Sequence, residues 1–332
     1  MNKNERKSVM LIYGGRGFER DVSLLGAKNL LPMLKKHYDV IPVMIDSGGG
    51  WFTENDQVFA TNFEGHGGLY RIKKQSFSKI DVAFPLLHGD FGEDGIVQGV
   101  LDSVGIPYVG CHHNEGAICR SKSTVKCIAE HLGIPTLPFV TVNNGDDGAI
   151  EEIEKNLQYP VIVKPDCLGS SIGLEKAEDR KELASAIKSS FAFSKKLIVE
   201  KMLSPRRELE CGYFATKEKT VFTHPSEIIY GDGVYDYEKK YIRDTRVSVV
   251  ADISCEISLK IQKYSKKLID FLGVRQISRV DFFLCGQDLY FNEINTMPGF
   301  TESSLYRKML EHAGINTDDA IISLIEECLL LK

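Results

Sequence analysis

Several features are missing from this 332-residue sequence, and each absence excludes a class of protein. No apolar run approaches the ~20 residues needed to cross a bilayer, so we expect no membrane partner. The net charge is −5, which leaves no broad basic surface, and nucleic acid is therefore not expected as a partner. The basic start, residues 1–8, is followed by no apolar signal core.

The cysteines also lack the spacing of a metal or disulfide motif, because none of the eight forms a CxxC pair. Scattered cysteines in a protein of this length predict reduced, mostly buried thiols and a cytoplasmic location. Hydrophobic residues make up 43% and charged residues 26%, the balance of a globular protein. The chain contains no internal repeat and is too long for one ordinary core, so two or three domains are expected.

The first third alternates strands and helices, which predicts a parallel α/β sheet. The elements expected there are strands at 9–13, 40–45, 80–87 and 106–109, and helices at 22–36 and 95–104. A helix over 123–131 ends at Gly133, and two prolines follow, which indicates a domain boundary. Further on we expect strands at 161–165, 197–200, 208–215 and 220–229, and helices at 180–190, 256–271 and 317–331.

Two segments near the end of the chain, 279–284 and 289–295, are rich in aromatic and β-branched residues and predict a hairpin. A three-residue loop over 286–288 is a common connection for such strands. Because side chains alternate along a strand, this loop sets the register and brings chosen side chains to one face.

In that register Asp281 lies opposite Glu293, and Arg279 lies opposite Asn295. Two carboxylates across a ladder repel each other unless positive charge lies between them. Carboxylate and amide oxygens on a rigid hairpin suit a hard cation such as Mg²⁺. The alternative is an ordinary edge hairpin with solvated charges.

The loop at 14–21 follows the first strand and opens a helix, so its backbone amides could hold an anionic group. The dinucleotide pattern GxGxxG fails because Arg20 stands at the third glycine, which disfavours a nicotinamide oxidoreductase. Glu19 in this loop is either a partner of the helix dipole or a carboxylate that receives a substrate ammonium.

A second loop, 88–95, leaves a strand at its carboxyl end, where open α/β sheets bind ligands. His88 at the start of this loop is either structural or functional. Glu93 and Asp94 are expected to cap the next helix.

A third loop, 166–173, follows Lys164 and contains two glycines and two serines, whose amides and hydroxyls are suited to phosphate oxygens. It does not match the Walker A pattern, and mobile loops of this kind often exclude water as lids. Residues 235–241 add three tyrosines in a polar stretch, which is either a surface loop or part of a site.

Together these segments resemble a D-alanine–D-alanine ligase, a member of the ATP-grasp superfamily. The matching segments cover nearly the whole chain, in order: 14–15 with 19–23, 87–89 with 92–95 and 98–99, 163–165, 169–173, 235–241, 279–281 and 292–305. The resemblance implies a multidomain protein of α/β and α+β class. It consists of an N-terminal parallel α/β (Rossmann-like) substrate domain at 1–120 and a two-part ATP-grasp fold. The latter comprises a central subdomain with the lid at 121–206 and a C-terminal subdomain at 207–332.

The resemblance also implies an activity. ATP phosphorylates the carboxylate of one D-alanine, and the amine of a second D-alanine displaces phosphate, giving a dipeptide for peptidoglycan precursors. The implied ATP-binding residues are Lys122, Lys164, Ser170, Ser171, Glu200, Lys201, Leu203 and Glu208. The implied ligands of two Mg²⁺ ions, with Mn²⁺ as a substitute, are Asp281, Glu293 and Asn295. A homodimer is implied as the assembly.

The implied substrate groups complete the site. Glu19 holds the first ammonium, His88 lies near that substrate, Arg279 and the Gly299 amide stabilise the oxyanion, and Ser304 and Lys240 bind the second carboxylate. Glu19, Ser170 and Tyr241 match a hydrogen-bonded triad that joins the lid to the site. The Lys240-Tyr241 pair and the Ser304-Leu305 ending favour D-alanine over D-lactate and over other second substrates.

The sequence departs from the family pattern at several positions. Gly17 replaces a common serine, Arg120-Ser121 precede Lys122 where Met-Asp is usual, and Cys167-Leu168 replace a charged pair in the lid loop. Arg307 stands where proline is frequent. Two other hypotheses therefore stay open: a ligase that joins D-alanine to D-serine or another amino acid, and a nucleotide-binding relative without turnover.

Overall fold

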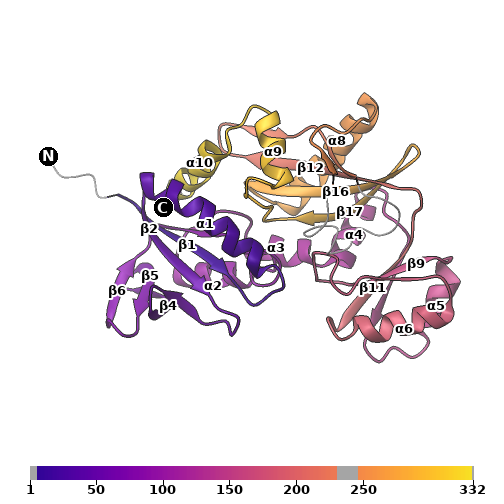
Figure 1. Ribbon diagram of the computed structural model, residues 1–332, viewed down its shortest axis with the longest axis horizontal. Coiled ribbons are helices and arrows are strands. Elements are labelled where there is room, and N and C mark those ends of the chain that lie inside the picture. Colours follow the sequence, from indigo (N-terminus) through magenta and orange to yellow (C-terminus); the bar gives the residue numbers. More distant parts are fainter. Residues whose placement is uncertain (1–5, 230–245, 331–332) are drawn as a thin grey trace.

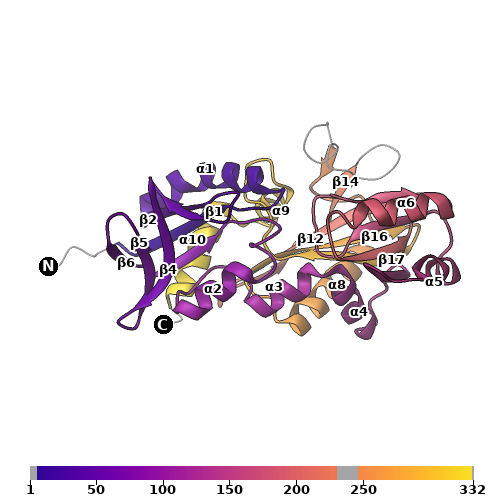
Figure 2. The same cartoon turned by 90° about the horizontal axis from the view of Figure 1, so that it is seen from below.

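The computed structural model describes residues 6–229 and 246–330. Three sheets follow one another along an elongated molecule (Figure 1). The N-terminal sheet lies at one end, the central sheet at the other, and the third sheet between them. Figure 2 shows the same order from a perpendicular direction, with α2, α3 and α8 along one side.

The N-terminal sheet has the strand order β6-β5-β4-β3-β2-β1-β7. Its strands are β1 (Ser8–Gly14), β2 (Asp39–Ile45), β3 (Trp51–Thr53), β4 (Asp56–Phe63), β5 (His66–Arg71), β6 (Ser76–Lys79) and β7 (Val82–Pro85). The predicted parallel arrangement is confirmed for β1, which pairs with β2 and β7.

Beyond this parallel part, β3 to β6 extend the sheet as antiparallel strands. Gly67 and Gly68 lie inside β5. A Cβ at Gly68 would come within 2.3 Å of the Ser78 carbonyl oxygen, so glycine there allows the strands to approach. The strand expected at 106–109 is only an isolated bridge between Ala83 and Tyr108.

Four helices belong to the first part of the chain: α1 (Arg20–His37), α2 (Ile96–Val104), α3 (His113–Arg120) and α4 (Lys122–His131). The Ser121 hydroxyl accepts a hydrogen bond from the Thr124 amide and thereby caps α4. Helix α3 was not predicted from the sequence. It ends at Arg120, directly before α4, and brings that arginine next to the loop after β7.

The central sheet has the order β10-β9-β11-β8, with two helices packed on it. Its elements are β8 (Phe139–Asn143), α5 (Ala149–Asn156), β9 (Val161–Pro165), β10 (Glu175–Ala177), α6 (Arg180–Ser190) and β11 (Lys196–Lys201). Helix α6 has the predicted bounds, because Asp179 accepts a hydrogen bond from the Glu182 amide as its N-cap. Residues of this sheet and its helices form a core of their own.

The third sheet is ordered β15-β14-β12-β16-β17, with β13 paired to β12. Its strands are β12 (Arg207–Ala215), β13 (Thr220–Phe222), β14 (Ser226–Ile229), β15 (Arg246–Ser248), β16 (Ile277–Cys285) and β17 (Asp288–Asn295). The single strand expected at 220–229 is therefore wrong, because residues 223–225, which include Pro225, separate β13 from β14.

The helices of this part are α8 (Cys255–Leu272), α9 (Leu305–His312) and α10 (Thr317–Leu329). Helix α8 begins after Ser254, whose hydroxyl accepts from the Ile257 amide, and ends at Gly273 with a φ of 72°. Across residues 6–229 and 246–330, no helix combines the length and apolarity that crossing a bilayer requires.

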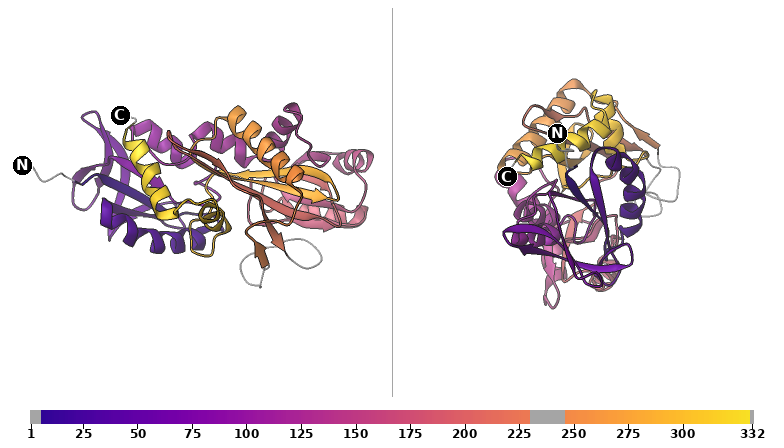
Figure 3. Two further views of the ribbon diagram at one scale, coloured as in Figure 1. Left: turned by 90° about the horizontal axis from the view of Figure 1, so that it is seen from above. Right: turned by 90° about the vertical axis from the view of Figure 1, so that its left-hand side faces the viewer.

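The end of the chain returns to the N-terminal domain. Helix α10 lies beside it, as Figure 3 shows, and the two share one core that includes Leu34, Phe84, Ile321 and Leu324. The Tyr38 hydroxyl donates to Glu326 at 2.7 Å across this contact. The same core includes Phe214 and Ile277 of the third sheet, so this sheet is joined to the N-terminal domain through α10. The loops of both can then face one site.

Candidate active site

The β16–β17 hairpin places the predicted acidic pair face to face. Asp281 pairs with Glu293, and Arg279 pairs with Asn295, so the predicted register is confirmed. The predicted three-residue loop is wrong, because the turn is shorter by one residue. Asn292 is an extra residue in β17 between the two halves of the ladder. The turn has one residue fewer than predicted and β17 has one residue more. The two differences cancel, so Asp281 still lies opposite Glu293.

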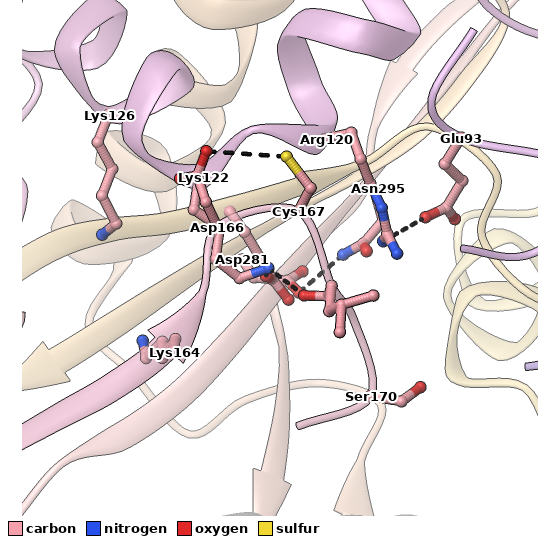
Figure 4. A network of polar contacts seen from close by, with 12 residues as sticks. Glu93, Arg120, Lys122, Lys126, Lys164, Asp166, Cys167, Ser170, Asp281 and Asn295 are labelled. Carbon is pink, nitrogen blue, oxygen red and sulfur yellow. Dashed lines mark hydrogen bonds and ion pairs between the residues drawn. The ribbon is translucent and has the colours of Figure 1, made fainter. Parts of the chain in front are cut away.

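Positive groups lie beside both carboxylates, as the repulsion argument requires. Arg279 donates to Asp281 through Nε at 2.7 Å and through its terminal nitrogen at 2.6 Å, a bidentate pair. The Asn295 amide donates to Asp281 at 3.0 Å. Lys122 lies 3.2 Å from Glu293, and Figure 4 shows Lys122, Asp281 and Asn295 together. A paired cation thus accompanies each acid.

The donor chemistry of this face fits a hard cation, since two carboxylates and one amide oxygen come from adjacent strands. Within the described parts of the chain, no group of three His, Cys, Asp or Glu side chains converges as a metal site. The Asn295 side chain offers an amide oxygen next to these two carboxylates on the hairpin. Two cationic side chains, Lys122 and Arg279, are also at hand for phosphate oxygens.

A pocket opens between the central and third sheets and contains every candidate ATP residue. Its lining includes Lys122, Lys164, Ser170, Ser171, Glu200, Lys201, Leu203 and Glu208, together with Arg279, Asp281 and Glu293. Apolar side chains from both sheets, among them Ile162, Leu174 and Phe283, complete the walls. A pocket lined by both apolar and charged side chains suits a planar base with a phosphate tail.

The sequence reasoning missed Lys126, which organises the inner end of the pocket. Glu200 is 1% exposed and is paired with two lysines, Lys126 at 2.7 Å and Lys164. Burial raises the pKa of Glu200, but the two ammonium groups outweigh it and hold the pKa at about 2. The carboxylate is therefore ionised at neutral pH and keeps Lys164 at the pocket wall.

Arg206 was also missed. It lies 3.0 Å from Glu208 and 5.0 Å above the Phe283 ring. Its guanidinium thus orients the acid expected at the ribose. The run Arg206-Arg207 beside a predicted strand was the available signal, but basic residues next to a turn are common on surfaces.

The lid loop, 166–173, is tied to the N-terminal domain. The Ser170 hydroxyl donates to Glu19 at 2.5 Å, and the Lys122 ammonium donates to the Leu168 carbonyl at 2.5 Å. Ser170 and Ser171 both have left-handed backbones, with φ of 53° and 56°, a strained pair that often occurs where a loop encloses a ligand. Tyr241 and Lys240, the other predicted partners of this region, lie outside the described residues.

The substrate candidates from the two ends of the chain meet beyond this pocket. His88 is buried, and its Nδ1 lies 3.0 Å from the carbonyl oxygen of Met297. Ser304 begins α9 and lies against Gly299, where a Cβ would come within 2.7 Å of the Ser304 hydroxyl. Glycine at 299 therefore leaves room for that hydroxyl.

One structural expectation for the loop after β7 is wrong. Glu93 does not cap α2, whose N-cap Gly95 has no side-chain bond. Asp94 accepts from the Ile96 amide, whereas Glu93 is buried and pairs with Arg120 at 3.3 Å. Burial raises the pKa of Glu93 to about 7, although Arg120 acts in the opposite direction. Arg120 is thus another residue that sequence reasoning did not assign to the site.

Glu93→Gln is expected to remove a pH dependence of stability. Because the pKa of Glu93 is raised above about 4.5, its usual value, the folded protein retains a proton that the unfolded chain releases. Stability is then lost as the pH rises through about 7. The free energy of unfolding is measured with urea at pH 5.5 and at pH 8.5. Between these two values the wild type should lose roughly 1–3 kcal/mol more than the variant. The exposed control Glu152→Gln should match the wild type, and equal losses in all three would contradict this assignment.

The comparisons with known proteins agree with this geometry. The chain matches the family models "D-ala D-ala ligase N-terminus" over residues 8–111 and "D-ala D-ala ligase C-terminus" over residues 128–326. The D-alanine–D-alanine ligase of Caldicellulosiruptor bescii is 35% identical over 96% of this chain and 93% of its own length. That of Enterococcus faecalis is also 35% identical, over 96% of this chain and 97% of its own length.

Solved structures show the same fold along the chain. D-alanyl-alanine synthetase A from Vibrio cholerae superposes with a TM-score of 0.88 at 29% identity, covering 99% of this chain and 100% of that one. The VanG D-Ala:D-Ser ligase from Enterococcus faecalis gives 0.88 at 30% identity, with 97% and 99% covered. The architecture is that of the ATP-grasp enzymes. Within that class the chain belongs to the D-alanine–D-alanine ligase family.

Proposed function

We propose that this protein joins two molecules of D-alanine to D-alanyl-D-alanine, converting ATP to ADP and phosphate, for peptidoglycan precursors. Family membership supports this activity. The observation that carries it in the structure is the shared pocket. There the eight candidate ATP residues adjoin the acidic hairpin, and the lid above them is bonded to Glu19.

The nucleotide would lie between the central and third sheets. Glu200, Lys201 and Leu203 would contact the adenine, and Glu208, oriented by Arg206, would bind the ribose. Lys122 and Lys164 would hold the phosphates, which the amides and hydroxyls of Ser170 and Ser171 would cover. A lid of this kind excludes water, so transfer goes to the carboxylate instead of to water.

Asp281, Glu293 and Asn295 would hold Mg²⁺, with two ions and with Mn²⁺ as a substitute. When bound, such ions would offset the negative charge of the phosphates during the transfer. The residues present fit this role, because their oxygens share one face of the hairpin and Arg279 and Lys122 lie beside them.

The first D-alanine would bind through its ammonium to Glu19, with His88 nearby. Its carboxylate accepts the γ-phosphoryl group, which forms an acyl phosphate and releases ADP. The unprotonated amine of the second D-alanine then attacks the acyl carbon. The C–N bond forms, the C–O bond to phosphate breaks, and the amine loses a proton. Arg279 and the Gly299 amide would stabilise the oxyanion in between.

Ser304 and Lys240 would bind the carboxylate of the second substrate, and Glu19, Ser170 and Tyr241 would act as the triad between lid and site. D-Serine is the second candidate for this subsite. The likeness to the VanG D-Ala:D-Ser ligase, at a TM-score of 0.88, is the observation that favours it.

The experiment is phosphate release with ATP and Mg²⁺. D-Alanine, D-serine, D-lactate and L-alanine are supplied alone and each paired with D-alanine, and products are identified by mass. We expect release with D-alanine alone and the D-alanyl-D-alanine product. A product only with D-serine would mean that D-serine is the second substrate, and the proposed mechanism would stand. No release with any of them, despite ATP binding, would overturn the proposal.

The remaining features of the proposal are a cytoplasmic homodimer and three domains, 1–120, 121–206 and 207–332. The separate core of residues 140–199 supports the central unit. All eight cysteines are free thiols, and four of them are buried. A reducing compartment suits them.

A further inference from the structure

Arg120 lies where the loop after β7 approaches the lid loop. It ends α3, its side chain is 8% exposed, and its two terminal nitrogens lie 3.3 Å from Glu93 and 3.3 Å from Asp90. Figure 4 shows the Arg120 guanidinium directed at Glu93. Sequence reasoning noted this arginine only as a departure from the family pattern.

Two glycines, one from each loop, leave the space that this guanidinium fills. A Cβ at Gly89 would lie 2.2 Å from the Glu19 carboxylate and 3.3 Å from a terminal nitrogen of Arg120. A Cβ at Gly169 would lie 3.2 Å from the other terminal nitrogen and 3.3 Å from Glu19. The Arg120 cation and the Glu19 carboxylate are thus enclosed together between the loop after β7 and the lid loop.

Charge explains why a cation belongs in this space. Glu19, Asp90 and Glu93 bring three carboxylates to one small region. Burial lowers the pKa of the Arg120 guanidinium, but these three acids raise it by more, so the net direction is upward. Arg279 also acts on Glu93, with Glu293 opposing it, but Arg279 is engaged with Asp281. Without Arg120 the three carboxylates would repel one another in a region where little water is present to screen their charges.

We propose that Arg120 is a positioning residue that holds Glu19 and the lid loop in the closed arrangement. It offsets the charge of Asp90 and Glu93, so that Glu19 can accept the Ser170 hydroxyl and receive the ammonium of the first amino acid. This role rests on the proposed function for its effect on catalysis, but not for its effect on the lid. It also connects two departures from the family pattern, because Arg120 lies under the loop that contains Cys167 and Leu168.

The test compares Arg120→Met with Arg120→Lys in the ligation assay. The methionine variant keeps most of the aliphatic stem and removes the charged guanidinium, and kcat/KM for the first D-alanine is expected to fall roughly 10²-fold. KM for ATP should change much less, because the adenine pocket is untouched. The lysine variant retains the charge but loses the planar, two-pronged guanidinium. Its kcat/KM should lie between those of the wild type and Arg120→Met. Equal values in wild type and Arg120→Met would overturn the proposal.

A second variant separates charge from packing. Asp90→Asn in the Arg120→Met background removes one uncompensated carboxylate, and roughly tenfold recovery is expected for coupled neighbours. A merely structural role predicts no recovery, and that outcome would overturn the proposal. The matched control is Arg180→Met, since Arg180 also pairs with two carboxylates, Glu151 and Glu154, but on the exposed side of the central sheet. It should behave as wild type.

Lid closure is measured apart from turnover, by hydrogen exchange of the amides at 166–173 with ATP and Mg²⁺ present. We expect ATP to protect these amides in the wild type and in Arg180→Met, and to protect them less in Arg120→Met. This readout stays valid if the wild type ligates none of the amino acids, a result that would refute the proposed function alone. Equal protection in Arg120→Met and wild type would refute the positioning role alone.

Discussion

Glu293→Ala is expected to lower the rate of ligation roughly 10²–10³-fold, the range for loss of one preorganised electrostatic group. The carboxylate faces Asp281 across the hairpin and pairs with Lys122 at 3.2 Å. Its removal takes away one oxygen donor for a hard cation and releases the lysine expected at the phosphates. Phosphate release, titrated against Mg²⁺, measures both the rate and the cation requirement.

The same substitution should leave the fold intact. Glu293 is partly exposed, and the repulsion between it and Asp281 disappears with it. Thermal unfolding is therefore expected to occur at or above the wild-type temperature. Asp288→Ala is the matched control, because Asp288 is an exposed acid on the same strand. Near-normal turnover by Glu293→Ala would refute the hairpin metal site.

Glu200→Gln is expected to have the largest effect on stability, a loss of about 3–5 kcal/mol, the usual result of removing one partner of a buried pair. Lys126 is 1% exposed, and this change would leave its ammonium without its carboxylate partner. Urea unfolding at pH 7 measures the loss. The exposed control Glu151→Gln, whose partner is Arg180, should lower the free energy of unfolding far less, because an ion pair in solvent contributes little.

The pH dependence gives this prediction a second readout. Because the pKa of Glu200 is held at about 2, below the usual value of 4.5, its contribution to stability is present above pH 4.5 and is lost as the pH falls toward 2. The difference in free energy of unfolding between the wild type and Glu200→Gln should become smaller as the pH falls through that range. Adding Lys126→Met to Glu200→Gln should restore part of the stability, since an apolar side chain replaces the uncompensated charge. No restoration would contradict the ion-pair account.

The hairpin shows what local pattern could and could not predict. Alternation along two strands placed Asp281 and Glu293 on one face, and the assumed loop length then set them opposite each other. The bulge at Asn292 was not predicted, because neither the residue type at this position nor the residues beside it signal an extra residue in the strand. The correct register resulted from two deviations that offset each other.

Buried polar groups were the main failure of sequence reasoning. Lys126 and Arg120 stand in helices where a basic residue usually belongs to a solvated face. Each is buried because a carboxylate distant in the chain, Glu200 or Glu93, lies opposite it. Glu93 was assigned to a helix cap for the same reason, since a local role was the only one visible in the sequence.

The sequence by itself determined the class of fold and the succession of elements, because these follow from periodicity and loop chemistry. The groups expected at the nucleotide came from the family resemblance. Only the tertiary structure decided which charges face one another. It joined the lid to Glu19, placed Arg120 among three acids and enclosed Lys126 with Glu200. These pairings depend on packing between distant segments. Their energies arise from burial, which a linear pattern does not specify.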